Sequence, residues 1–477
     1  MTAIYIAGIA MTVFGRHFER SLEDLAREAV DGALKDAGCA KEHLGTAFYA
    51  GITNGPLQGQ FAIPGQVVLG KLGIDGIPVY NIDNGCAAGS SAFALAVQSL
   101  KAGVTDVALA LGAEKMNVED KLSVLKLMEA GWDVSRVDEN YARLVKLGEG
   151  IVPPEGSESD KPYSKFMSIY AALCRNHMKK WGTTQRQIAA VSAKNHQHSV
   201  HNPWSQFRKG FTIDEVLAAP PITYPLTLPM CAPVTDGAAA AIICTEEGLK
   251  RIGADRSRCI KVAASVVRSA TSRSIDQHEL NLARLAANQA YEIAGLGPND
   301  MHVAEVHDAA AMGEIIQVEN LGFVEMGEGG PAAERGDFTI GGRLPVNPSG
   351  GLESKGHPLG ATGIGQLYEL VTQLRGEAGA RQVEGARHRG MVGVLQACAH
   401  HLAVRLLLVT HLDRPGAVVG HDDQHRRLMA CGGVDLHRVE AEGAVAGGHH
   451  HRAVGAGEAG GHAEGRADAD AAQRARV

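Results

Sequence analysis

Short apolar segments alternate with amphipathic helical segments along most of the chain, and this alternation limits the possible fold more than any other feature. Ser21 is predicted to cap a helix that runs to Gly38, because Asp24 completes a capping box and apolar residues then recur at helical spacing. Buried strands are predicted over Thr46–Ile52, Pro78–Ile82 and Val104–Gly112. Helices that alternate with short buried strands are typical of an α/β fold whose strands run mostly parallel.

The second half of the chain repeats this pattern. A helix is predicted over Asn281–Leu296 and a short strand over Val303–Val306, and a glycine-rich turn at 347–363 then leads into another helix. The first half has the same order, with a glycine-rich turn around Cys86 before its own helix. We therefore expect a duplicated α/β core in which two glycine-rich helix N-termini face each other across a pseudo-twofold axis.

The regular alternation stops near Met116 and resumes after Leu228. A mixed stretch of this length is too long for a simple loop, so an inserted subdomain is expected there. The predicted domains are an N-terminal half (1–118), the insert (119–228), a return strand and helix of the N-terminal half (229–255), a C-terminal half (256–410) and a tail (411–477).

The last part of the chain has an anomalous composition. Residues 388–477 contain no Lys, Ser, Asn, Ile, Phe, Tyr or Trp, although they hold eleven of the chain's 21 histidines. The stretch 390–410 still has the apolar pattern of a strand pair, so the anomalous tail is placed from residue 411. Two explanations stay open: a coding sequence read out of frame, which resequencing of the DNA would test, or a disordered low-complexity tail.

Composition opposes several classes of protein. The net charge of −7 opposes a nucleic-acid-binding surface, and no apolar run approaches the ~18 residues of a membrane span. The N-terminal segment lacks the basic region and the cleavage site of a signal peptide, and it is predicted to be a first strand. The eight cysteines are scattered without a C-x-x-C pair, which is typical of a reducing compartment. We therefore expect a cytoplasmic globular enzyme.

One cysteine stands in a reactive context. Cys86 lies between a predicted strand and a predicted helix, with Gly85 and Gly89 beside it and small residues after it. Unpaired N–H groups and the positive dipole end of a helix N-terminus stabilise a thiolate, which is the reactive form of cysteine. The alternative is a buried structural cysteine, but the turn and its glycines favour a nucleophile.

Two histidines are candidate partners of Cys86. His357 lies in G-H-P-L-G-A-T-G, again at a predicted helix start, and could accept the thiol proton. His307 follows the predicted strand that ends at Val306, and sites in open α/β sheets lie at the carboxyl ends of their strands. Each histidine alone is more often a satisfied core or surface residue.

Three separate segments, in order and spacing, resemble the motifs of thiolases: NGCAAGSSA, VHDAA and GGLESKGHPLGATG. The segments KNHQHSVHNPWSQF and CAPVTDGAAAAI are similar to those of the sterol-carrier-protein or lipid-transfer branch of that superfamily. The resemblance covers about residues 1–387. It implies duplicated βαβαβ halves packed as a layered α/β/α/β/α core, an inserted loop domain that grips CoA, and a homodimer or homotetramer.

The resemblance also implies roles for the three residues. The cysteine that matches Cys86 takes the acyl group, the histidine that matches His357 activates it, and the one that matches His307 helps to form an oxyanion hole. This chain departs from the pattern at Ala309, where sterol-carrier-type thiolases usually have a second acid/base cysteine. Other thiolases take that cysteine from a C-terminal Cys-x-Gly turn, and here the nearest residue is Cys398, without the glycines.

The expected function is that of a thiolase-like acyltransferase, in which Cys86 attacks an acyl- or 3-oxoacyl-CoA and His357 and His307 polarise the carbonyl. Release would go to CoA by thiolysis or to a carbanion by Claisen condensation. Two alternatives stay open: an aldolase acting on CoA esters with a small OB-fold partner, favoured by Ala309, and a non-catalytic protein that binds acyl-CoA or lipid.

Other signals are weaker. Lys179, Arg208 and Lys209 contribute to a locally basic insert, and solvated helix faces are the default interpretation of such charge. The 3′-phospho-ADP group of CoA needs basic partners, so the three are candidates for that contact. The sequence has no P-loop and no G-x-G-x-x-G after a strand. We expect no metal and no redox cofactor, with CoA as substrate or product.

Overall fold

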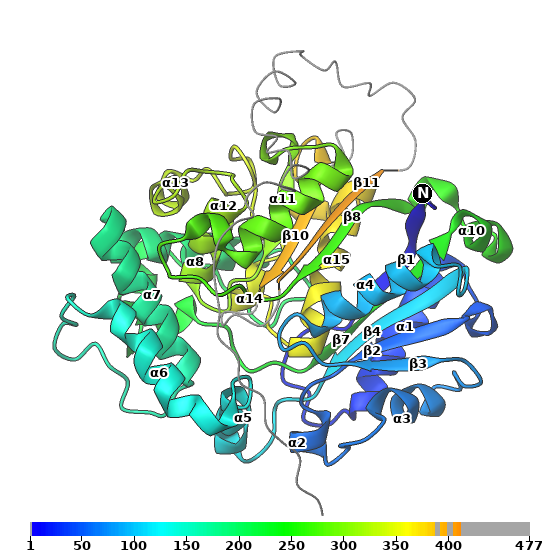
Figure 1. The fold of residues 1–477 in the computed structure, drawn as a ribbon, viewed down its shortest axis with the longest axis horizontal. Helices are drawn as coiled ribbons and strands as arrows, with labels where there is room; N and C mark the ends of the chain where they lie inside the picture. The colour runs from blue at the N-terminus through cyan, green and yellow to red at the C-terminus, as the bar shows by residue number, and fades with distance from the viewer. Residues whose placement is uncertain (1, 387–391, 398–403, 412–477) are drawn as a thin grey trace, which may run out of the picture. The chain divides into compact units, whose positions relative to one another are not determined.

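A nine-stranded mixed sheet forms the centre of the protein. The computed structural model describes residues 2–386, 392–397 and 404–411, and within these the strand order is β3-β2-β4-β7-β1-β8-β11-β10-β9 (Figure 1). The tail predicted from residue 411 lies outside the described residues except for His411, and Cys398 lies outside them as well.

Five strands of the sheet belong to the first half of the chain: β1 (Ile4–Met11), β2 (Thr46–Ala50), β3 (Val79–Ile82), β4 (Val107–Glu114) and β7 (Gly237–Thr245). Strand β2 pairs in parallel with β3 and β4, whereas β7 is antiparallel to β4 and β1. The predicted parallel α/β character is confirmed. Strand β4 begins three residues later than Val104, because Thr105 makes a turn in which its Oγ1 accepts from Val107 N–H.

The second half repeats this arrangement with β8 (Ile260–Arg268), β9 (Val303–Val306), β10 (Val392–Ala397) and β11 (Val404–His411). Strands β9 and β10 are parallel, and β11 is antiparallel to β10 and β8. These strands correspond in order to β1, β2, β4 and β7, so the predicted duplication is confirmed. The counterpart of β3 is reduced to a single parallel bridge between Ala304 and Val346.

Four long helices cover the two halves in layers: α1 (Leu22–Ala37), α4 (Ala88–Lys101), α11 (Leu282–Ala294) and α15 (Leu359–Arg375). Helix α1 packs on β1 and β7, and α11 packs on β8 and β11. Helices α4 and α15 pack against each other and lie between the two halves of the sheet. This is the α/β/α/β/α layering that the resemblance implied, and it explains why alternate residues of β7 belong to two different apolar clusters.

The α4–α15 contact depends on glycine. A Cβ placed on Gly89 would lie 2.2 Å from the Gly360 carbonyl oxygen, and one on Gly112 would lie 2.0 Å from it. No side chain fits in that space, so the N-terminal turns of α4 and α15 approach each other as bare backbone.

Residues 119–228 contribute no strand to the nine-stranded sheet. They form α5 (Lys121–Glu129), α6 (Val137–Val145), α7 (Lys165–Trp181), α8 (Gln185–Ser199), α9 (Ile213–Leu217) and a small pair, β5 (Pro221–Thr223) and β6 (Leu226–Thr227). Helices α5 to α7 lie on the left of Figure 1.

The remaining helices are short: α2 (Asn54–Gln58), α3 (Pro64–Lys71), α10 (Glu246–Ile252), α12 (Ala311–Asn320), α13 (Gly329–Arg335) and α14 (Gly351–Ser354). Within the described part of the chain, no helix combines the length and the apolar character needed to cross a bilayer.

Candidate active site

Cys86 lies in the tight turn between β3 and α4. The turn is closed by hydrogen bonds from Ala87 N–H to the Asn84 carbonyl oxygen (3.0 Å) and from Ala88 N–H to the Gly85 carbonyl oxygen (3.0 Å). Gly85 has a φ of 53°, in the left-handed region that glycine adopts without strain. Helix α4 begins at Ala88, so Cys86 lies just before its first turn and beside the positive end of its dipole.

His357 lies in the corresponding position of the second half, just before α15. Gly356 has a φ of 114°, and His357 N–H donates to Thr235 Oγ1 (3.1 Å), which fixes the loop. The ring Nδ1 lies 2.7 Å from Thr362 Oγ1, and the Thr362 hydroxyl donates to the Pro358 carbonyl oxygen (2.9 Å).

This arrangement sets the tautomer of His357. Because the Thr362 hydrogen is used on Pro358, Thr362 Oγ1 must accept, and Nδ1 of His357 must carry the proton. Nε2 is then left with a free lone pair, and it has no hydrogen-bond partner among the described residues. His357 is therefore arranged to accept a proton at Nε2.

His307 completes the cluster from the carboxyl end of β9. Its ring is T-shaped to that of His357, with centroids 5.0 Å apart. Neither ring nitrogen of His307 has a hydrogen-bond partner among the described residues. The adjacent Asp308 accepts from Leu352 N–H (2.8 Å) and from Asn195 Nδ2 (3.0 Å), so the turn that carries His307 is fixed to α14 and α8.

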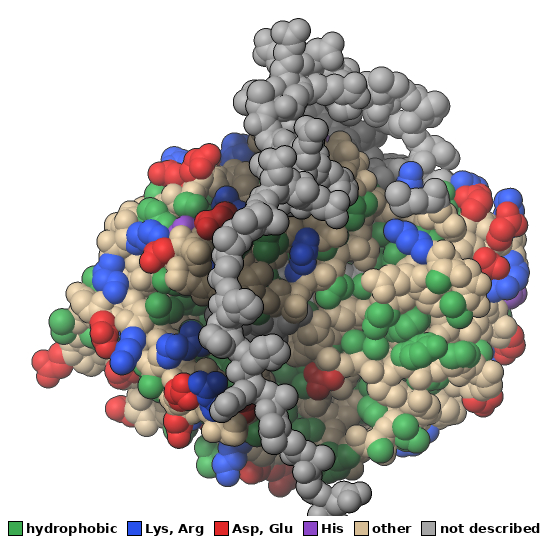
Figure 2. Space-filling view, in the orientation of Figure 1, with side chains coloured by type: hydrophobic (Ala, Val, Ile, Leu, Met, Phe, Trp, Pro, Cys, Tyr) green, Lys and Arg blue, Asp and Glu red, His purple; other side chains and the backbone are tan. Residues whose placement is uncertain are grey.

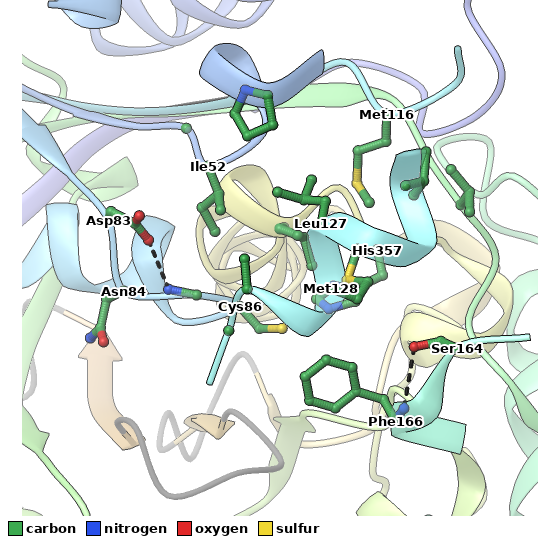
Figure 3. Close-up of a pocket in the computed structure, with 18 of the residues that line it drawn as sticks. Ile52, Asp83, Asn84, Cys86, Met116, Leu127, Met128, Ser164, Phe166 and His357 are labelled. Carbon is green, nitrogen blue, oxygen red and sulfur yellow. Dashed lines mark hydrogen bonds between the residues drawn. The ribbon is translucent and has the colours of Figure 1, made fainter. Parts of the chain in front are cut away.

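The structure brings the three predicted residues together. Cys86 Sγ and one ring nitrogen from each of His307 and His357 all lie within 4.8 Å of one another. They line a pocket of about 980 Å³, and Figure 3 shows Cys86 and His357 beside Leu127, Met128 and Phe166 in it. Residues about 220 and 270 positions from Cys86 along the chain thus contribute to one site.

Burial keeps both histidines neutral near pH 7. It lowers the pKa of His307 to about 4 and holds the pKa of His357 well below its usual range, with the neighbouring His307 adding to the effect on His357. A neutral His357 can accept a proton from a thiol. A neutral His307 has one N–H and can donate it to an oxygen that becomes negative.

A buried carboxylate that sequence reasoning missed supports the site through hydrogen bonds to its backbone. Glu114, at the end of β4, accepts hydrogen bonds from Ile52 N–H (2.7 Å), Gly360 N–H (3.1 Å), and both the N–H and the hydroxyl of Thr53. It therefore joins the pocket wall at Ile52 to the first turn of α15. Burial raises the pKa of Glu114 to about 7, against the effect of these donors. No local pattern in the sequence marks this residue.

The three basic residues predicted to contact CoA lie outside the pocket. Lys179 donates to the Glu149 carbonyl oxygen, Lys209 Nζ lies 4.9 Å from the centre of the Phe211 ring, and all three side chains are exposed. None of them is among the described residues that line the pocket. Their contact with CoA stays a prediction.

Ala309 lines the pocket, at the position where the resemblance leads us to expect a second cysteine. Cys231 lies nearby in the fold, because its backbone forms a bridge to Ala310. However, Cys231 is not among the described lining residues, and burial raises the pKa of its thiol far above the usual range. Cys231 therefore does not replace the missing group.

The cluster has two possible chemistries. A thiol, a basic imidazole and a second imidazole with a free donor are the parts of a nucleophilic acyl-transfer site. Cys86, His307 and His357 are also residue types that bind zinc. The three residues line a large and mostly apolar pocket, and no carboxylate belongs to the cluster.

A duplicated five-layer α/β core, with a cysteine turn and a histidine turn that face each other, is the arrangement that the resemblance to thiolases implies. Comparison with known families agrees: residues 4–215 match the thiolase N-terminal domain and residues 263–405 match the thiolase C-terminal domain-like family. The chain belongs to the thiolase family.

Curated relatives show which branches are similar. Sterol carrier protein 2 of Oryctolagus cuniculus is 36% identical over 80% of this chain and 68% of its own length. Acetyl-CoA acetyltransferase of Methanothermobacter thermautotrophicus is 35% identical over 81% of this chain and 94% of its own. Benzoylsuccinyl-CoA thiolase subunit BbsB of Thauera aromatica is 32% identical over 80% and 91%.

Solved structures share the fold at low sequence identity. The Ltp2-ChsH2(DUF35) aldolase matches with a TM-score of 0.68 and 22% identity, over 86% of this chain and 98% of the other. Human mitochondrial 3-ketoacyl-CoA thiolase matches with a TM-score of 0.60 and 16% identity, over 86% and 99%.

Proposed function

We propose that this protein is a thiolase-type acyltransferase that forms an acyl-Cys86 intermediate from an acyl- or 3-oxoacyl-CoA. The observation that carries the proposal is the convergence of Cys86, His307 and His357 within 4.8 Å in a pocket large enough for an acyl-pantetheine. Membership of the thiolase family and the acyltransferase among the relatives support it.

The residues divide the first half-reaction between them. His357 Nε2 accepts the proton of Cys86 Sγ while the sulfur attacks a carbonyl carbon. With an acyl-CoA, the bond between that carbon and the CoA sulfur breaks, and CoA leaves with a proton. With a 3-oxoacyl-CoA, the C2–C3 bond breaks and its electron pair goes to C2, which then takes a proton. His307 N–H stabilises the carbonyl oxygen as it becomes negative.

The test is direct detection of the intermediate. The protein is incubated with acetoacetyl-CoA and longer 3-oxoacyl-CoAs, and the Cys86 peptide is analysed by mass spectrometry. We expect an acyl mass on that peptide, absent in Cys86→Ser, while Cys231→Ser serves as the matched control and retains it. An unmodified Cys86 with every substrate, in a folded protein, would refute the proposal.

A second candidate is an aldolase that acts on CoA esters with a small OB-fold partner. Ala309 favours it, because the pocket lacks a described thiol that could serve as the second acid/base. The shared fold with an aldolase whose title names a DUF35 component, and a relative named as a subunit, support a search for such a partner. Aldol cleavage needs no acyl-cysteine, so a Cys86→Ala variant that still released a carbonyl product would favour it.

We propose a homodimer or homotetramer. Strand β3 is the outer strand on one side of the described sheet, and its Tyr80 is 49% exposed. Figure 2 shows hydrophobic side chains gathered on the face that carries β3 and α4 in Figure 1. An unpaired edge with apolar side chains is suited to pairing with a second copy.

We also propose a reducing cytoplasm as the compartment and a metal-free site. Cys39, Cys174, Cys231, Cys244 and Cys259 form no disulfide, which supports the first. For the metal-free site, turnover and Cys86 acylation should be unchanged after exhaustive dialysis against a chelator.

The exposed Lys179, Arg208 and Lys209 remain our candidates for the CoA phosphates, and their substitution by Ala should raise the KM for CoA esters.

A further inference from the structure

Helix α5 forms an apolar wall opposite the nucleophile. Val124, Leu125, Leu127 and Met128 line the pocket, whereas Leu122 on the same helix does not and is 55% exposed. Val124 belongs to a small apolar cluster with Met116 and Leu359, against which Cys86 and Met128 pack. The face of α5 that meets the substrate space is therefore entirely apolar (Figure 3).

Aromatic residues extend this wall. Trp132, just after α5, and Phe166, at the start of α7, both line the pocket with ring centroids 5.1 Å apart. Tyr170 lines it one helical turn beyond Phe166. Methionine side chains adapt to irregular shapes and contact rings favourably, so Met116 and Met128 suit a branched or cyclic group.

The charged side chains that line the described pocket are all acidic. Among the described residues that line it, none is Lys or Arg, and the charged ones are Asp83 and Asp133. Both carboxylates are held in place: Asp83 accepts from Gly85 N–H (3.2 Å) and Asp133 from Ser135 N–H (3.0 Å). A carboxylate on the acyl group would lose its water and would meet no cationic side chain among these lining residues.

We propose that the α5 face selects a neutral, bulky apolar acyl group, branched or ring-bearing, over an acetyl group and over an acyl group that carries a carboxylate. This inference rests on the proposed acyl transfer to Cys86 and names its substrate class. An acetyl group touches little of this wall, whereas a ring or branched chain reaches both α5 and the Trp132–Phe166 pair. Burial of that apolar surface favours the larger substrate.

The experiment compares kcat/KM for four 3-oxoacyl-CoAs. Acetoacetyl-CoA and 3-oxo-5-phenylpentanoyl-CoA differ in bulk, and 3-oxohexanoyl-CoA and 3-oxoadipyl-CoA differ by a terminal carboxylate at the same chain length. We expect the phenyl substrate to exceed acetoacetyl-CoA by about tenfold or more, in line with the selectivity of apolar pockets. We expect 3-oxohexanoyl-CoA to exceed 3-oxoadipyl-CoA by at least as much.

Two variants of α5 locate the selectivity. Met128→Trp fills the pocket, so the preference for the phenyl substrate over acetoacetyl-CoA should fall about tenfold or more. Leu127→Lys supplies a cation, so kcat/KM for 3-oxoadipyl-CoA should rise relative to kcat/KM for 3-oxohexanoyl-CoA. Poor folding of the variant cannot produce such a rise. Leu122→Trp, on the exposed side of α5, is the matched control and should leave both ratios unchanged.

The outcomes separate this inference from the proposed function. If Cys86 is acylated but wild type prefers acetoacetyl-CoA or 3-oxoadipyl-CoA, the selectivity inference is wrong and the acyl transfer stands. Ratios that respond to Leu122→Trp as strongly as to Met128→Trp would also overturn it. If no substrate acylates Cys86, the proposed function itself fails.

Discussion

At the residue scale, the function of the site depends on single hydrogen bonds that set which atom holds a proton. Thr362 accepts from His357 Nδ1 and donates to the Pro358 carbonyl oxygen, which leaves Nε2 as the base. Glu114 holds the first turn of α15 and the pocket wall, although it is not among the described residues that line the pocket. Such positioning residues are as testable as the residues that react.

Thr362→Val should lower kcat/KM about tenfold to a hundredfold, because the valine cannot accept from Nδ1 and the tautomer of His357 is no longer fixed. The rate of Cys86 alkylation should also fall, and its dependence on pH should change. Thr362→Ser retains the hydroxyl and should recover most of the rate. Equal losses in both variants would show that the residue acts through packing.

His307→Ala should lower the rate by about 10²–10³, which is the usual effect of removing one oxyanion donor. Its KM should change less than its kcat, because the donor acts mainly on the developing charge. His307→Gln retains an N–H and should recover part of the rate. Wild-type kinetics in His307→Ala would reassign the residue to a structural role.

Glu114 should give the protein a pH-dependent stability. Its pKa of about 7 in the fold lies above the unfolded value of 4.5, so its contribution is fully present below pH 4.5 and is lost as pH rises through 7. The loss amounts to about 3 kcal/mol over that range. Denaturant unfolding at several pH values gives the free energy of unfolding of wild type and of Glu114→Gln. The difference between the two values isolates Glu114, because the other titratable groups are the same in both proteins. If the free energy of unfolding of both proteins changes with pH in the same way, the raised pKa of Glu114 is wrong.

At the scale of elements, the site is formed where the N-terminal ends of two helices lie against each other. Helices α4 and α15 carry Cys86 and His357 on the turns before them, and backbone approaches backbone at Gly89, Gly112 and Gly360. The separation of thiol and imidazole therefore depends on the absence of side chains at the helix contact.

Gly89→Ala should push α4 away from α15, because the new Cβ would lie 2.2 Å from the Gly360 carbonyl oxygen. We expect a lower melting temperature and a loss of turnover larger than the loss of folded protein. Gly70→Ala in α3 is the matched control: nothing lies within 4 Å of its Cβ, and alanine favours a helix by about 1 kcal/mol. Similar behaviour of the two variants would contradict this reasoning.

At the scale of the whole molecule, duplication places one apolar edge at the outside of the first half. Strand β3 has Tyr80 stacked on Phe48 at 5.1 Å and exposed to solvent, whereas its counterpart in the second half is a single bridge at Val346. The two edges are therefore unequal, and the β3 edge is the better surface for a second copy.

Tyr80→Glu should shift the protein toward a monomer, because a charge on the β3 edge opposes pairing. Light scattering after size-exclusion chromatography measures the mass. Val134→Glu changes a residue that is 72% exposed in the insert, and it should leave the mass unchanged. An unchanged oligomer in Tyr80→Glu would place the interface elsewhere.

The class of fold and the three candidate residues could be predicted from the amino-acid sequence, because turns, caps and alternating patterns are local. Cys86, His357 and His307 each stand at a glycine-rich turn or a strand end that neighbouring residues define. The tautomer of His357, the role of Glu114 and the apolar face of α5 could not be predicted, because each depends on contacts between distant parts of the chain. Glu114 meets Gly360 across 246 positions of the chain, and no local pattern encodes a contact that exists only after the two halves pack.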